Sequence, residues 1–187
     1  MEGEKYEKLS QLLPDTIKLC SEIADGAKQL SEGVRNFKEG LKKKPFFVRP
    51  FVTRDFESGT GLKADEWIDL AERTSRRFQS IADALQKAQE HLSASEKEKL
   101  TEDFVNIKTV AKPFLDNCDL LIETLSRFQK YMAEAPERAK SIPKAFLSEE
   151  DRKMMVEESP KAAEGIKKLV KALDEAKTKI LEVESLK

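Results

Sequence analysis

Residues 23–43 decide the fold, because they read IADGAKQ, LSEGVRN and FKEGLKK, one pattern written three times in sevens. Each copy has an apolar residue, an acid two places later, a glycine, a second apolar residue and then a base. The apolar positions alternate by four and three, which is typical of a helix that packs along other helices by one narrow stripe. The stretch therefore predicts a long helix in a protein built from such helices.

The glycines of this repeat, Gly26, Gly33 and Gly40, flank the apolar stripe, and Gly165 has matching neighbours near the C-terminus. A glycine inside a helix costs about 1 kcal/mol relative to alanine. We interpret these glycines as close helix contacts, where the missing side chain lets a neighbouring helix approach. The alternative is a weakened first helix that rearranges when it binds a membrane or a partner.

The same alternation continues in three later segments, the last of them from Ala162 to Val183. Pro14 is predicted to begin the first long helix, after a short helical lead-in. The pattern favours an all-α fold, namely an antiparallel up-down-up-down four-helix bundle with heptad seams. The alternative is a pair of long hairpins that extend or dimerise. We expect one domain over 1–187 with a long first connection over 42–62 and helices at about 14–44, 63–92, 95–132 and 148–187.

The composition limits which classes of protein this chain can belong to. The 187 residues carry a formal net charge of −1, which argues against a general nucleic-acid binder. The N-terminus has no basic start followed by an apolar run, so no signal peptide is expected, and no stretch has the length and apolar character of a membrane-spanning helix. We expect a cytoplasmic protein, with a peripheral position on a membrane as the second option.

Catalytic chemistry is not indicated. A di-metal carboxylate site in a helical bundle needs Glu-x-x-His pairs, and the chain has a single histidine, His91, preceded three places earlier by Ala88. Cys20 and Cys118 fall on the apolar stripes, too far apart along the helices for a disulfide, and are expected to behave as small apolar residues. No glycine-rich phosphate loop is present. We therefore predict no enzyme, no metal site and no cofactor.

The first connection is the candidate functional segment, since residues 42–54 hold five bases, three phenylalanines and no acid. In an up-down-up-down bundle it lies at the same end as residues 133–147, which carry Arg138, Lys140, Lys144 and Phe146. Bases with interleaved aromatic residues favour docking on an anionic membrane or lipid surface. The predicted binding residues are Lys42, Lys43, Lys44, Phe46, Phe47, Arg49, Phe51 and Arg54.

Two other interpretations of this segment stay open. In the first, Phe46, Phe47 and Phe51 fold back to seal the open end of the core, and the three lysines favour the C-terminal dipole of the first helix. In the second, the protein is an intracellular adaptor that binds a partner protein through a helix face or through the loop end. The sequence does not decide the oligomeric state, so a homo-oligomer is compatible with either interpretation.

Overall fold

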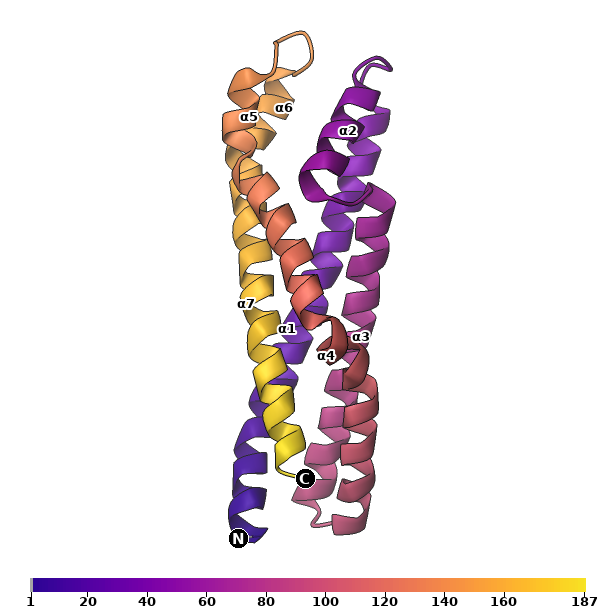
Figure 1. Ribbon diagram of the computed structural model, residues 1–187, viewed down its shortest axis with the longest axis vertical. Helices are drawn as coiled ribbons and strands as arrows, with labels where there is room; N and C mark the ends of the chain where they lie inside the picture. Colours follow the sequence, from indigo (N-terminus) through magenta and orange to yellow (C-terminus); the bar gives the residue numbers. More distant parts are fainter. Residues whose placement is uncertain (1) are drawn as a thin grey trace. The chain divides into compact units, whose positions relative to one another are not determined.

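The structure is a computed structural model that describes residues 2–187 (Figure 1). These residues form helices and connecting turns, with no strand among them, which confirms the all-α prediction. The long helices are α1 (Glu2–Lys42), α3 (Ala64–Ser93), α4 (Lys97–Ala133) and α7 (Ser159–Ser185). The shorter elements are α2 (Arg49–Thr60), α5 (Ala135–Ser141), α6 (Glu149–Lys153) and the π-helical turn η1 (Met154–Glu158).

The chain divides into two compact units, and each long helix contributes to both. The first unit contains Met1–Lys28, Glu72–Asp119 and Lys171–Lys187, and the second contains Gln29–Ala71 and Leu120–Val170. The expectation of a single domain stays a prediction.

The core of the first unit is built from the predicted stripes. Ser75 Oγ of α3 donates to the carbonyl oxygen of Ala24 in α1 at 2.8 Å, and the rings of Phe78 and Phe114 meet edge to face with centroids 4.7 Å apart. Lys177 Nζ of α7 donates to Asp119 Oδ1 at 3.1 Å. Buried stripe residues here include Ile23, Ala27, Phe78, Ile81, Leu85, Ala88, Leu100, Phe104, Ile107, Ala111, Phe114, Cys118, Leu173, Ala176, Ile180 and Val183.

The first helix begins at Glu2, not at Pro14 as predicted. An interior proline removes one backbone hydrogen bond and costs about 3 kcal/mol. Leu9 and Leu13 are both buried in the first unit, and burying each leucine contributes about 1.5–3 kcal/mol. Packing of the turns just before Pro14 therefore offsets its cost, and the predicted lead-in and the predicted helix are one continuous α1.

The predicted long loop over 42–62 is wrong for most of its length, because residues 49–60 form α2. Pro50 sits in the first turn of α2, where a missing N–H costs no hydrogen bond, so it starts a helix instead of breaking one. Gly61 ends α2 in the left-handed region with φ 88°, and its N–H donates to the carbonyl of Glu57 at 2.9 Å. Likewise residues 135–141, predicted as part of a connection, form α5, with Pro136 in its first turn.

The close-contact interpretation is also wrong for Gly33, Gly40 and Gly165. A Cβ added at Gly33, Gly40 or Gly165 would have no neighbouring atom within 4 Å. In the first turn of α7 the buried alanine is Ala163, whereas the predicted Ala162 is exposed. The glycines of the repeat at 33 and 40 therefore lower helix stability without permitting a closer packing, which favours the weakened-helix alternative.

Replacing Gly33 and Gly40 by alanine is therefore expected to stabilise the protein. Each change should raise the free energy of unfolding by up to about 1 kcal/mol, because alanine has the higher helix propensity and the added methyl group meets open space. Thermal unfolding followed by circular dichroism would measure the effect.

The matched control is Gly59→Ala in α2, where an added Cβ would overlap the Tyr131 ring. This variant is expected to lose about 1–3 kcal/mol by overpacking. A melting temperature that falls for Gly33→Ala as it does for Gly59→Ala would show that Gly33 has a packing requirement after all.

Candidate functional site

All eight predicted binding residues lie in the second unit, at the end of α1, in the turn that follows it and in α2. They separate into two groups. Lys44 and Arg49 take part in the internal structure of the turn, whereas the other six are on its surface, three of them aromatic (Phe46, Phe47 and Phe51) and three basic (Lys42, Lys43 and Arg54).

Arg49 closes the end of α1. Its Nη2 donates to the carbonyl oxygen of Lys42 at 2.6 Å, and its Nε donates to that of Lys44 at 2.8 Å. Carbonyl groups at the C-terminus of a helix have no partner within the helix, so the guanidinium group supplies the missing donors. Arg49 is thus a capping residue that fixes where α2 begins relative to α1.

Lys44 links this turn to α6. Its Nζ lies 2.5 Å from Asp151 Oδ2, and Asp151 N donates to Ser148 Oγ at 3.1 Å in the N-cap of α6. Burial disfavours the charged carboxylate, but the hydrogen bonds from Lys44 and Ser148 outweigh it and hold the pKa of Asp151 below its usual value. The ion pair therefore joins α6 to the turn that follows α1.

Four phenylalanines gather on the surface here, and we call Phe46, Phe47, Phe51 and Phe146 the phenylalanine patch. Their exposed fractions are 81%, 56%, 53% and 39% respectively. The ring centroids of Phe46 and Phe47 are 5.8 Å apart, and Phe146 lies 6.3 Å from Phe47 and 6.1 Å from Phe51. The rings hold one another in place while much of their apolar surface stays open to solvent.

Phe146 was not among the predicted binding residues. It comes from the turn between α5 and α6, about a hundred positions along the chain from the other three. The sequence signal was present, because residues 133–147 were expected at the same end as residues 42–54, but contact between particular rings is a tertiary feature.

The core beside the patch is closed by other residues, so the prediction that Phe46, Phe47 and Phe51 seal it is wrong. Val48 and Phe56 are 3% and 4% exposed. The Phe56 ring stacks on Phe37 with centroids 4.5 Å apart and meets Phe128 edge to face at 5.7 Å. Because α2 places Phe56 in the core, Phe46, Phe47 and Phe51 are not needed there.

A second set of contacts anchors α2 and α5 to the long helices. Trp67 Nε1 of α3 donates to Thr60 Oγ1 at 2.8 Å, and the hydroxyl of Tyr131 in α4 donates to Asp55 Oδ2 at 2.8 Å. The Arg138 guanidinium lies 3.7 Å from the centroid of the Tyr131 ring. Burial and the hydrogen bond to Asp55 raise the pKa of Tyr131, so its hydroxyl stays a donor. The base of the patch is therefore rigidly held.

The bases around the patch differ in whether they form an ion pair within the protein. Lys42 pairs with Glu39 at 2.8 Å within the last turn of α1, on the surface. Lys43, Arg54 and Lys144 are exposed. An ion pair between exposed side chains is weak, because water has a high dielectric constant. Exposed bases near the apolar rings therefore keep their charge available to an anionic surface. Lys43, Arg54 and Lys144 are thus the bases best placed to act together with the patch.

The histidine of the first unit, His91, lies beside two acidic side chains. His91 Nδ1 lies 2.5 Å from Oδ2 of the buried Asp103, and its Nε2 lies 3.8 Å from Glu96. This histidine ties the end of α3 to the start of α4. Over residues 2–187, no group of three or more His, Cys, Asp or Glu side chains is placed to hold a metal ion.

In the part of the chain that the structure describes, no helix combines the length and the apolar character that crossing a bilayer requires. No protein-family model, curated protein or solved structure matches the chain. The interpretation of the site therefore rests on its own geometry.

The two cysteines are free and buried in the first unit. Burial raises the pKa of the Cys20 thiol to about 12, from an ordinary value of 9.0. Burial also raises the pKa of Cys118, although the nearby Lys177 acts in the opposite direction. Because the thiolate is the reactive form, neither cysteine is disposed to act as a nucleophile.

Cys20 is therefore expected to resist a maleimide dye at about pH 8 in the native protein and to react once the protein is unfolded in denaturant. The pKa is higher in the folded state than in the unfolded state, so the unfolded chain loses its proton first. The free energy of unfolding should then fall as the pH rises above about 9. Rapid labelling of Cys20 in the native state, read by mass spectrometry, would contradict the buried position.

Proposed function

We propose that this protein is a non-enzymatic helical protein that docks on an anionic membrane or lipid surface through the phenylalanine patch and the bases around it. The observation that carries the proposal is the exposure of Phe46, Phe47 and Phe51 while Val48 and Phe56 fill the core in their place. Exposed apolar side chains gathered at one place mark interaction sites in soluble proteins.

Two favourable contributions to the binding free energy support docking on a membrane. Full burial of one phenylalanine contributes about 1.5–3 kcal/mol, and Phe46 leaves most of its surface available for burial. Each base near an anionic bilayer adds about 1 kcal/mol. Neither term alone gives stable anchoring, so the proposal requires both, and it predicts reversible binding that depends on anionic lipid. An adaptor that binds a partner protein through the same patch is the alternative.

The non-enzymatic part of the proposal is supported by the buried thiols of Cys20 and Cys118 and by the pairing of His91 with Asp103. A nucleophile needs an accessible side chain with a base next to it, and neither cysteine offers this.

We also propose that the long helices form the antiparallel up-down-up-down bundle expected from the sequence and that the chain unfolds as one domain. Support comes from the short turn between α3 and α4 and from Lys5 Nζ of α1, which lies 3.4 Å from the carbonyl oxygen of Lys187. Trp67 fluorescence reports on the second unit, and the accessibility of Cys118 reports on the first. The two probes are expected to give coincident unfolding transitions in urea. Separate transitions would mean that the two units are separate domains.

The membrane proposal predicts that the wild-type protein co-sediments with vesicles of phosphatidylserine and phosphatidylcholine but not with phosphatidylcholine alone. Phe46→Ser combined with Phe47→Ser should weaken vesicle binding by at least about tenfold, because the apolar surface that enters the bilayer is lost. The melting temperature should stay unchanged, since both rings lie outside the core. The matched control is Val105→Ser with Leu181→Ser, which removes two exposed apolar side chains of the first unit.

The contribution of charge is tested by Lys43→Glu with Arg54→Glu, which spares the structural residues Lys44 and Arg49. This variant should lose about tenfold or more in binding, whereas the same change at Lys167 and Lys168, two exposed bases of α7, should lose less. Added salt should weaken wild-type binding, because exposed charges are screened over about 8 Å at physiological ionic strength. Wild-type protein that ignores anionic vesicles at low salt would end the membrane proposal in favour of the adaptor.

A further inference from the structure

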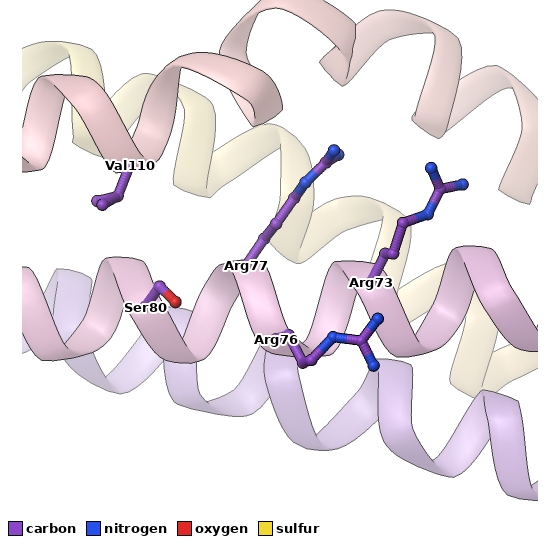
Figure 2. A pocket seen from close by; sticks show the side chains of 5 residues that line it. All are labelled: Arg73, Arg76, Arg77, Ser80 and Val110. Carbon is purple, nitrogen blue, oxygen red and sulfur yellow. The ribbon is translucent and has the colours of Figure 1, made fainter.

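A group of three arginines lies on the surface of α3, outside the region used by the proposed function. Arg73, Arg76 and Arg77 line a hollow of about 350 Å³ together with Ser80 and with Val110 of α4 (Figure 2). All five residues belong to the first unit. The three arginines and Ser80 are exposed, and Val110 is half-buried.

The helical spacing brings the polar groups to one side of the hollow. Positions 73, 77 and 80 follow one another by four and three, which places them on neighbouring turns of the same face. Figure 2 shows Arg73 and Arg77 extending from α3 in a similar direction, while Arg76 leaves the helix at another angle. Four residues of an α-helix rise by about 6 Å, so the array presents its positive charges over more than one turn.

Of the three arginines, Arg73 has an interaction within the chain. Among residues 2–187, neither Arg76 nor Arg77 has an ion pair. An anion in the hollow would neutralise the charge of these two guanidinium groups and accept hydrogen bonds from them.

We propose that the hollow is a binding site for a ligand that carries two or more phosphate groups. A guanidinium group presents a planar fork of donors that matches phosphate oxygens in bidentate geometry, which favours phosphate over a halide or a single carboxylate. The Ser80 hydroxyl adds a neutral donor, and Val110 supplies an apolar wall. The volume is at the lower end of the range for small-molecule sites, about 300–1,000 Å³, and suits a small polyphosphate group.

Such a group can belong to a soluble metabolite or to a phosphorylated lipid headgroup. The chemistry that binds the arginines is the same for both sources, so the experiment has one arm for each. Inorganic tripolyphosphate represents the soluble ligand, and vesicles of phosphatidylcholine with a bisphosphorylated phosphoinositide represent the lipid.

Calorimetric titration of the full-length protein with tripolyphosphate is the first arm. Wild type is expected to bind, and Arg76→Gln with Arg77→Gln should weaken binding by about tenfold or more, equivalent to about 1.4 kcal/mol. Arg76→Lys with Arg77→Lys keeps the charge but loses the fork, so an intermediate affinity is expected. The control is Lys167→Gln with Lys168→Gln, which removes the same charge from α7 and should bind like wild type. Circular dichroism should give the same helical content for all variants.

The second arm measures co-sedimentation with the phosphoinositide vesicles. If binding depends on Arg76 and Arg77 in both arms, the site recognises phosphate groups on either a soluble ligand or a lipid. If it depends on them only in the vesicle arm, the site recognises the lipid headgroup. Phe46→Ser with Phe47→Ser should leave tripolyphosphate binding unchanged. The proposal for this site and the proposal for the phenylalanine patch can therefore be rejected independently. The proposal is overturned if wild type binds neither probe, or if the lysine control loses as much affinity as the arginine variant.

Discussion

Each long helix of this protein has a single narrow stripe of apolar side chains to bury, and the remainder of the structure depends on burying it. With 37% of the residues charged, the other faces of these helices must stay in water. Isolated helices gain little from propensity alone, so packing of the stripe supplies most of their stability. The strength of this packing is visible at Pro14, which α1 passes through because Leu9 and Leu13 are buried beside it.

The second unit contains short helices in addition to the long ones, and these short helices determine which side chains stay outside the core. Through α2, Phe56 reaches Phe37 and Phe128, and Thr60 reaches the indole of Trp67. Once these positions are filled, Phe46, Phe47 and Phe51 have no place in the core. The Arg49 cap and the Lys44–Asp151 ion pair hold the turn so that the rings are displayed on a fixed base. The phenylalanine patch is thus a consequence of how the core is completed.

The two candidate surfaces use charge in different ways. Around the phenylalanine patch the bases are dispersed and accompany apolar rings, an arrangement that suits a broad anionic surface with an apolar interior. On α3 the guanidinium groups are concentrated within about two turns beside a hydroxyl, which suits a compact ligand with several acceptor oxygens. Under the two proposals, docking at the first surface depends on apolar area and long-range attraction, and binding at the second depends on directional hydrogen bonds.

The sequence by itself determined the helical class and the buried stripes, because the periodicity of apolar residues is a property of neighbouring positions. It also located most of the candidate site, since bases and aromatic residues are concentrated in one short segment. The tertiary structure alone decided that Gly33 faces open space, that Lys44 and Arg49 are structural, and that Phe146 joins the patch. The spacing of Val48, Val52 and Phe56 is compatible with a helix, but whether a ring is buried depends on the side chains that other helices place around it. That is settled by contacts between residues far apart in the chain, which no local pattern records.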